Sequence, residues 1–567
     1  MMILKKIFKN RTARLVLLLV LAAVISFAIY YVTLPALNVH NVGFWTYLFC
    51  VFLIFGAAIG VFDLSSVLGE VGRGFYSYPK KKNVVNEKHG FLNRSVIAKI
   101  GICVIVAPLI VVVLGGIVSS TVFNARRYAD IIEVEERVFT EDMPSVSKIN
   151  NIALVDTESA IILGERKLGR LENVVSQYIV SSGYTQINYK GHPMKVASLE
   201  YDGFFKWLNN RSQGVPGYIM VDAVQNKADY MELSEGIIYT ESAYFGEDLE
   251  RKLRFDYPTK IFDRISFEVD ENGKVWYVVS CATAKIGLFG AMDIHEVILF
   301  DPVSGVSELM SVDETPSWVD IVYDGYLACE KYDWKGIYSG GFLNSLIGNK
   351  GCKQTTDDFG YIMRDDDVWY FTGVTSITAD QSNIGFVLSC ARTGEYVFYL
   401  VEGAEEHSAM GAAEGEVQEK EYYASFPTLV NIAGEPTYIM VLKDANALVK
   451  LYALVNVKQY NIVATASTQS DVIAAYVQLL KQNGIDTSDS LVPDSSVDIT
   501  VSDIKFLSMA GIDYAYLTAE DGKVFRVEFN ATNEAIVLVK IKDVLSVEAV
   551  LDEKTGIYQV SSWKKSE

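Results

Sequence analysis

The chain has 567 residues, with 50 lysines and arginines against 70 aspartates and glutamates, and a formal net charge of −20 at pH 7. A protein this acidic repels nucleic acid and anionic lipid head groups, which disfavours DNA or RNA binding. The charge is divided unevenly: residues 1–123 hold 12 basic and 3 acidic residues, whereas the remainder holds 38 basic and 67 acidic residues.

Three apolar stretches near the start of the chain predict membrane-spanning helices, at about residues 15–32, 43–62 and 100–123. The third has no charged residue between Lys99 and Arg126, which is long enough to cross a hydrocarbon layer of about 30 Å. The first two are joined by a short link without lysine or arginine, which predicts a helical hairpin. The first apolar run is longer than that of a signal peptide and no A-x-A site follows it, so we interpret it as an uncleaved anchor.

Basic residues predict the orientation of these helices. Those at the head of the chain are Lys5, Lys6, Lys9, Arg11 and Arg14, and those in the loop before the third helix are Arg73, Lys80, Lys81, Lys82, Lys88 and Arg94. Basic loops stay in the cytoplasm, so three crossings place residues 124–567 outside it, in the envelope of a bacterial cell, with only Arg126 and Arg127 opposing. The spans carry no ionisable residue at depth, which favours an anchor over a transporter.

Residues 124–240 are expected to form a juxtamembrane stalk, up to about residue 150, and then a module of helices and strands. Alternating residues predict strands at Tyr184–Tyr189, Lys195–Leu199 and Tyr218–Ala223. Tyr201–Asn209 predicts a short amphipathic helix whose inward side chains are Phe204, Phe205, Trp207 and Leu208. Three nearby basic residues predict a solvated turn or a polar contact with an acidic neighbouring module; they are Arg166, Lys167 and Arg170.

From residue 241 the chain repeats a pattern of hairpin and helix. In residues 241–340, a helical stretch (GEDLERKLRFDYP) precedes hairpins that turn at Asp270–Gly273 and Asp301–Gly305, and PSWVDIVYD is expected to be the closing helix. Two further copies occupy residues 356–485, with closing helices at Glu402–Gln418 and at TQSDVIAAYVQLLKQ. A lone hairpin cannot bury its apolar face, so each is expected to pack under a helix.

This unit resembles the PepSY-type module, in which a hairpin with a D-x-x-T/S-G-E turn belongs to an antiparallel sheet packed on a helix. The resemblance rests on Trp276–Gly305, Trp369–Glu395 and Leu451–Ala466. The middle copy has the intact turn Thr393-Gly394-Glu395, whereas the first has Ser304-Gly305-Val306 and the third lacks the glycine. The resemblance implies an extracytoplasmic, often membrane-tethered protein that restrains or binds peptidases and envelope components.

The end of the chain predicts a separate small β-barrel. Residues 484–498 are polar, as is typical of a linker, and residues 499–567 contain about five alternating strands. Five short strands in this length suit a small barrel, and the pattern is similar to that of an OB-type barrel. OB-type barrels often bind nucleic acid or sugar. The strands here carry few basic residues, so we expect a contact with protein or a structural role.

The six cysteines show no zinc-binding spacing. Cys50 and Cys103 lie in apolar segments, and the four in the acidic body are Cys281, Cys329, Cys352 and Cys390. We expect these four to be separate, partly buried thiols, with disulfides as the alternative in an oxidising compartment. Aromatic residues between the first two repeats are expected to fill the core, or alternatively to line a contact surface; they are Tyr332, Trp334, Tyr338 and Phe342.

Catalytic and cofactor motifs are absent from the sequence: there is no G-x-S-x-G, Walker A or Rossmann fingerprint. His295-Glu296 does not continue into H-E-x-x-H and predicts an ordinary strand histidine. Asp365–Asp367, with Asp357 and Asp358, offer oxygen ligands for Ca²⁺, but their spacing is not that of an EF-hand, so a solvated turn is expected. No catalytic, cofactor-binding or metal-binding residue is therefore assigned.

The expected fold is three transmembrane helices (residues 1–123) followed by an extracytoplasmic α+β region of several modules and a small C-terminal β-barrel. The favoured function is a non-enzymatic binding or scaffold protein of the bacterial envelope, which regulates a peptidase or wall enzyme through an envelope protein partner. One alternative is an envelope hydrolase with an unconventional carboxylate site, for which paired acids of shifted pKa in a deep pocket would be the sign. The other is an accessory subunit of a membrane complex.

Overall fold

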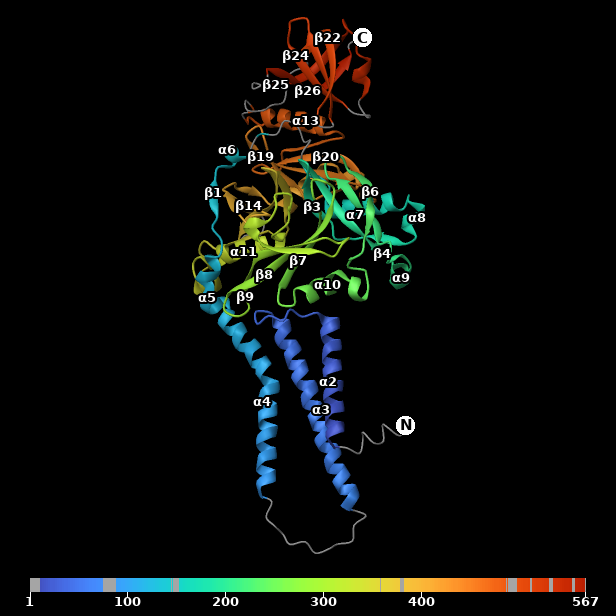
Figure 1. Cartoon of the computed structure of the whole chain (residues 1–567). Coiled ribbons are helices and arrows are strands. Elements are labelled where there is room, and N and C mark those ends of the chain that lie inside the picture. Colours follow the sequence, from blue (N-terminus) through green and yellow to red (C-terminus); the bar gives the residue numbers. More distant parts are fainter. Residues whose placement is uncertain are drawn as a thin grey trace.

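The computed structural model describes residues 11–74, 88–143, 145, 152–356, 358–377, 382–485, 487, 497–509, 512–529, 534–552 and 556–565. Three long helices extend from one side of a sheet-rich body, and a small barrel lies at the opposite end (Figure 1). The expected order, three apolar helices followed by a sheet-rich region with helices, is confirmed. The basic loop residues Lys80–Lys82 lie outside the described residues, and so does most of the predicted linker at 484–498.

The long helices are α2 (Arg11–Thr33), α3 (Val42–Gly74) and α4 (Lys88–Ser119). Each contains an apolar stretch long enough to cross a membrane, at Thr12–Thr33, Val42–Gly60 and Gly101–Ser119. The third helix ends earlier than residue 123, because Ser120 adopts an extended backbone and a separate helix, α5 (Thr121–Ala129), begins after it.

Residues 124–143 were expected to form a stalk, but they are packed into the body. Tyr128 of α5 lies edge-on to Trp334, with ring centroids 5.1 Å apart. Strand β1 (Glu135–Arg137) pairs in parallel with β15 (Tyr396–Tyr399), and Phe139 of α6 (Phe139–Asp142) is buried in the core between two sheets. The chain therefore leaves α4 and enters the body directly.

Four sheets make up the body, and their strand pairs are antiparallel except for the parallel pair of β1 and β15. The first contains β2 (Tyr178–Val180), β3 (Thr185–Tyr189), β4 (His192–Tyr201), β5 (Val215–Asp222) and β6 (Lys227–Ile237). The second contains β7 (Ile261–Val269), β8 (Val275–Ile286), β9 (Gly290–Phe300) and β10 (Ser307–Ser311). The third contains β1, β11 (Lys353–Thr355), β12 (Gly360–Arg364), β13 (Asp367–Ser376), β14 (Ser382–Cys390), β15 and β16 (Gly403–Ala404). The fourth contains β17 (Tyr423–Ala424), β18 (Thr428–Ile432), β19 (Glu435–Lys443), β20 (Val449–Asn456) and β21 (Val463–Ala466).

Contacts link these sheets in a cycle. The first and second share one hydrophobic core, the third and fourth share another, and apolar residues around a helix fill the space between the second and third. The fourth sheet returns to the first through Lys443, whose Nζ lies 2.6 Å from the carboxylate of Asp156. Strands that follow one another in the chain pair in each sheet, at β3–β6, β7–β10, β12–β15 and β18–β21, and strands such as β1, β2 and β17 pair outside that order.

Helices cover the outer surfaces and gaps of the sheets. They are α7 (Thr157–Leu168), α8 (Glu172–Val175), α9 (Phe204–Asn210), α10 (Leu249–Asp256), α11 (Gly325–Tyr338), α12 (Glu406–Glu416) and α13 (Gln469–Gln482). The expected closing helix at PSWVDIVYD is wrong, because the helix is α11, which starts where Asp324 caps it by accepting from the N–H of Tyr326. In α9 only Trp207 is buried, while Phe205 is 75 % exposed.

The C-terminal strands pair in the closed order β22 (Val497–Met509), β23 (Ile512–Ala519), β24 (Val524–Phe529), β26 (Ile557–Lys565) and β25 (Val544–Asp552). A pairing between β25 and β22 completes the cycle. The hydrophobic core of this barrel consists only of residues between 499 and 563. It is therefore a structural unit with its own interior.

Candidate functional site

The body is attached to α4 by hydrogen bonds to one serine. Ser119 Oγ accepts from the backbone N–H groups of Leu288 (2.8 Å) and Phe289 (2.9 Å), which lie in the turn between β8 and β9. Gly115, one helical turn earlier, allows this approach, because a Cβ there would lie 2.5 Å from the Phe289 ring. The end of α4 and the second sheet therefore meet in close contact.

The link between α2 and α3 makes a second attachment. Its backbone and side chains bond to α10 and the residues after it: Arg254 Nε donates to Leu34 O (3.0 Å), Leu37 N to Pro258 O (2.7 Å), and Asn38 Nδ2 to Thr259 O (2.9 Å). His40 Nδ1 also donates to Leu288 O at 2.8 Å. Two separate attachments restrict rotation of the body about either helix end, so the body is held in one orientation above the helices.

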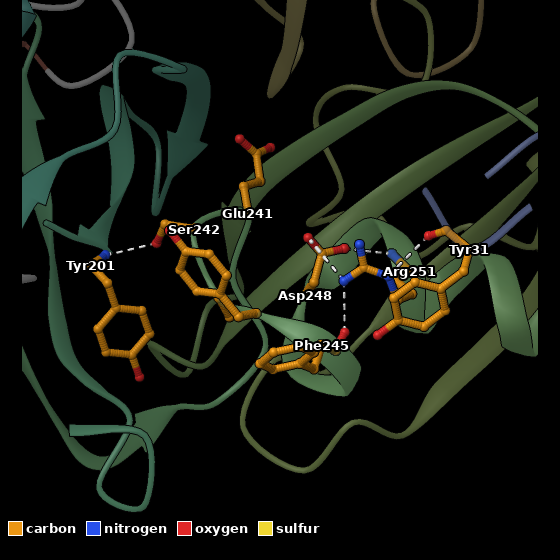
Figure 2. A pocket seen from close by; sticks show the side chains of 9 residues that line it. Tyr31, Tyr201, Glu241, Ser242, Phe245, Asp248 and Arg251 are labelled. Carbon is orange, nitrogen blue, oxygen red and sulfur yellow. Dashed lines mark hydrogen bonds and ion pairs between the residues drawn. The ribbon is translucent and has the colours of Figure 1, made fainter. Parts of the chain in front are cut away.

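A cavity of about 410 Å³ lies beside the second attachment (Figure 2). Its walls come from α2, from β4 and from the segment that leads into α10; the lining residues are Tyr31, Tyr201, Glu241, Ser242, Ala243, Tyr244, Phe245, Asp248 and Arg251. Four of these nine residues are aromatic. The cavity therefore presents aromatic walls at the level where α2 ends.

Arg251 organises this cavity. Its guanidinium lies 4.4 Å from the centre of the Tyr31 ring and donates to Phe245 O at 2.8 Å, and one of its nitrogens is 3.7 Å from the Asp248 carboxylate. Across the cavity, partial burial and the nearby carboxylates of Glu200, Glu250 and Asp248 raise the pKa of Glu241. Arg251, the one basic residue in the cavity lining, is thus bonded to other residues of the protein, and the environment of Glu241 favours its protonated form.

A second cavity, of about 840 Å³, lies between β7, β9 and the start of α11. It is lined by Asp263, Arg264, Ile265, Met292, Asp324, Tyr326, Leu327 and Glu330. Arg264 is paired with Asp324. The other two acids have no such partner: burial and Asp324 raise the pKa of Asp263, and burial and Asp263 raise the pKa of Glu330. Both acids are exposed to solvent, and a raised pKa favours the protonated carboxyl group, which is the form that a general acid needs.

A third polar group is sealed inside the body. Burial raises the pKa of Glu268 to about 7, although its carboxylate accepts from the N–H of Asp320 (2.8 Å) and from Ser266 Oγ (2.8 Å). Burial and the adjacent Glu268 raise the pKa of Asp320 well above its usual range. Two carboxylates that are close together and buried away from water resist ionisation, so the pair of Glu268 and Asp320 retains a proton. We interpret the pair as a structural contact between sheets.

The acidic residues and the histidine that the sequence offered as candidate ligands do not form one site. Asp367 forms a two-point ion pair with Arg392 (2.6 and 2.7 Å), Asp365 pairs with Arg364, and Asp357 lies outside the described residues. In the part of the chain that the structure describes, no group of three or more His, Cys, Asp or Glu residues is placed to hold a metal ion. His295 lies in β9 and its Nδ1 donates to Cys281 O, which confirms a strand histidine.

The structure also tests the predictions for the cysteines, the aromatic residues and the basic turn. The four body cysteines are free, which confirms separate thiols. Tyr332 is buried, as expected for core filling. Arg166 donates to the backbone oxygen of Asn446 in the fourth sheet (3.0 Å), which is a contact with a neighbouring module. Sequence reasoning missed Asp263, Asp324 and Glu330, because they come from two distant segments and no motif joins them.

Comparison with known proteins gives no family for this chain. No family model matches the sequence, and no curated protein matches it. The crystal structure of polysaccharide lyase Uly1 is similar over 60 % of this chain and 74 % of that chain, at 8 % identity and a TM-score of 0.15. A crystal structure of an ACO/RPE65 chimera is similar over 69 % of this chain and 62 % of that chain, at 9 % identity and a TM-score of 0.13. Scores this low carry no argument about fold or function.

Proposed function

We propose that this protein is a membrane-anchored binding or scaffold protein, with its body on the extracytoplasmic side of a bacterial plasma membrane. The observation that carries the proposal is the double attachment of the body to the ends of the apolar helices, through Ser119 and through Arg254. A flexible tether would only keep the body near the membrane. A fixed attachment also sets its height and orientation, which is what a scaffold that meets another envelope protein needs.

The orientation is supported by the uneven distribution of basic residues about the three spans. The nature of the partner, a peptidase or wall enzyme, is supported only by the resemblance of the repeats to PepSY-type modules. An accessory role in a larger membrane complex is a variant of the same proposal, in which the partner contacts the helices as well.

Proximity labelling tests this proposal. A peroxidase fused after Glu567 of the full chain is expected to label extracytoplasmic proteins with a probe that does not enter the cytoplasm, and one peptidase or wall enzyme should recur among them. The matched control is the same fusion with Ser119→Ala and Arg254→Met, which loosens both attachments and should reduce recovery of that partner. Absence of labelling with this probe, together with labelling of cytoplasmic proteins by a membrane-permeant probe, would overturn the orientation and the proposal.

A second candidate function, hydrolysis of an envelope polymer, is favoured by the acids of the 840 Å³ cavity. Burial and Asp324 raise the pKa of Asp263, and burial and Asp263 raise the pKa of Glu330, so two acids that favour their protonated forms line one cavity. Purified full-length protein would be incubated with cell-wall glycan and with denatured protein. If the protein is a hydrolase, we expect degradation products that are lost with Asp263→Asn and with Glu330→Gln. The products should persist with Asp313→Asn, a control at an acid outside the cavity. Product formation that is unchanged in all three variants would contradict it.

A further inference from the structure

The membrane-facing side of the body carries an exposed aromatic surface. Its side chains come from α9, from the short helix η1 (Phe245–Glu247) with the residue before it, and from α10; we define this membrane-facing surface as Phe204, Phe205, Leu208, Tyr244, Phe245 and Phe255. Phe205 is 75 % exposed and Phe245 is 59 % exposed. Single exposed apolar residues are ordinary, whereas a contiguous group marks a contact site.

The surface is contiguous on the α9 side. The ring of Phe204 lies 5.5 Å from that of Phe205 and 5.0 Å from that of Tyr244, measured between centroids. The buried Trp207 supports both parts, because its ring is 5.3 Å from Tyr244 and 5.8 Å from Phe245. The exposed rings therefore rest on a rigid aromatic base and do not depend on a loose loop.

The height of this surface is set by α2. Phe255 packs against Tyr30 and Tyr31, with ring centroids 5.8 and 6.2 Å apart. Both tyrosines lie within the apolar stretch Thr12–Thr33, in its last turn, and at a rise of about 1.5 Å per residue they are about 5 Å or less below its end. Phe255 is therefore at the depth where a membrane-spanning helix passes from hydrocarbon to head groups.

The 410 Å³ cavity is lined both by Tyr31, whose ring contacts Phe255, and by Tyr244, whose ring contacts Phe204 of α9. Tyr31 lies beside Arg251 at one end of the cavity, and Phe245 lies farther toward Tyr201 (Figure 2). In the whole molecule, α9 and α10 both lie on the side of the body from which the long helices extend (Figure 1). The aromatic surface thus continues outward from the end of α2.

We propose that this membrane-facing surface lies in the interfacial layer of the same bilayer that the three helices cross. Tyrosine is enriched in that layer because its ring has an apolar body and a polar edge, and phenylalanine and leucine are typical of the face that interfacial helices bury there. The occupant is lipid and not a protein partner, because the surface is continuous with residues of a spanning helix. The inference rests on the proposed membrane anchoring, and it adds that the body itself contacts lipid.

Fluorescent labelling of the full chain tests this inference. The three native cysteines that are not fully buried, Cys50, Cys103 and Cys329, are replaced by alanine, and one cysteine is introduced for an environment-sensitive label. Three labelled chains are compared in phosphatidylcholine vesicles, with and without lipid that carries a nitroxide quencher near the head group: Phe205→Cys, Val32→Cys and Leu538→Cys. Val32 is an exposed residue of α2 and Leu538 is an exposed residue of the barrel, far from the helices.

We expect the nitroxide lipid to reduce emission about two-fold at Phe205→Cys and at Val32→Cys, and to leave Leu538→Cys unchanged. Quenching at Val32→Cys alone would overturn the aromatic contact while preserving the membrane anchor. No quenching at either position would overturn the anchor itself. If the label at Phe205→Cys resists both nitroxide lipid and aqueous iodide, a protein or a second copy of the chain covers the surface, which also contradicts the inference.

Discussion

Single polar side chains determine how the body meets the helices. Ser119 is the last residue of α4, and its hydroxyl accepts two backbone N–H groups that would otherwise lack a protein partner in that turn. Its own carbonyl accepts from the Tyr128 hydroxyl at 2.7 Å. One residue therefore connects α4, α5 and the second sheet.

Ser119→Ala is expected to destabilise this attachment by about 1–3 kcal/mol, because two amides lose their acceptor in a half-buried place. Hydrogen exchange at Leu288 and Phe289, measured on the full chain in lipid nanodiscs, should accelerate. The control is Ser120→Ala, since Ser120 precedes α5 without a side-chain cap and its hydroxyl donates only to Ile117 O. Equal acceleration in the two variants would contradict the role given to Ser119.

Buried acids make the stability of the body depend on pH. Glu406 is fully buried, its carboxylate accepts from Gly373 N (2.6 Å) and Thr356 Oγ1 (3.1 Å), and burial raises its pKa to about 7. The folded state holds this proton more tightly than the unfolded state. The stabilisation is therefore complete at pH below the unfolded pKa and is lost as pH rises through about 7.

Glu406→Gln is expected to remove this loss, because an amide can accept from Gly373 and donate to Thr356 without ionising. Between pH 5 and pH 8 the stability of the variant should rise relative to the native chain by about 2–3 kcal/mol, at about 1.4 kcal/mol per pKa unit. Thermal unfolding at both pH values measures the difference. Glu416→Gln, at an exposed position of the same helix, serves as control, and an identical pH dependence in both variants would refute the assignment.

At the scale of elements, helices were predictable where one face is apolar over several turns. The residues of α13 that are buried, Val472, Ile473, Tyr476, Val477 and Leu480, recur at helical spacing after a Thr468 cap, so sequence and structure agree. In contrast, α11 buries Lys331, whose ammonium lies 2.6 Å from Asp293. A buried lysine breaks the apolar pattern, and its partner is distant in sequence, so this helix was missed.

Leu480→Ala in α13 is expected to cost about 2–5 kcal/mol, because it leaves a cavity between the helix and the fourth sheet. Gln478→Ala, on the exposed face of the same helix, should change stability by no more than about 0.5 kcal/mol. Denaturant unfolding followed by the circular dichroism of the body compares the two. Similar losses would mean that α13 does not cover the sheet in solution.

Features formed by residues that are adjacent in sequence were predictable, whereas the candidate cavities, which bring distant segments together, were not. Strand hairpins such as Asp270–Gly273 were predicted because turn residues are adjacent in sequence, and that turn is found between β7 and β8. The acids Asp263 and Glu330 line one cavity because α11 packs against the second sheet, and sequence spacing does not encode that packing. The exposed rings on α9 were missed for a related reason: an apolar residue was assumed to point inward.

Considered as a whole, the molecule consists of a helix bundle, a cyclic body and a barrel, and the barrel has a core of its own. Removal of residues 497–567 is expected to leave the thermal transition of the body unchanged, because none of the barrel side chains that the structure describes contributes to the other hydrophobic cores. Calorimetry in nanodiscs should show two transitions for the full chain, and the shortened chain should lack only the transition of the barrel. A lowered transition in the shortened chain would show that the barrel supports the body.

The double attachment has a mechanical consequence for the bilayer. Since Ser119 and the 34–41 link are both bonded to the body, the spacing and tilt of α2 and α4 are fixed at that end by contacts with the body. Both α3 and α4 exceed 30 residues, far more than the roughly 20 that a crossing needs. In the proposed membrane setting, a change in bilayer thickness would therefore require adjustment at the opposite ends of the helices, and the two leaflets would be affected unequally.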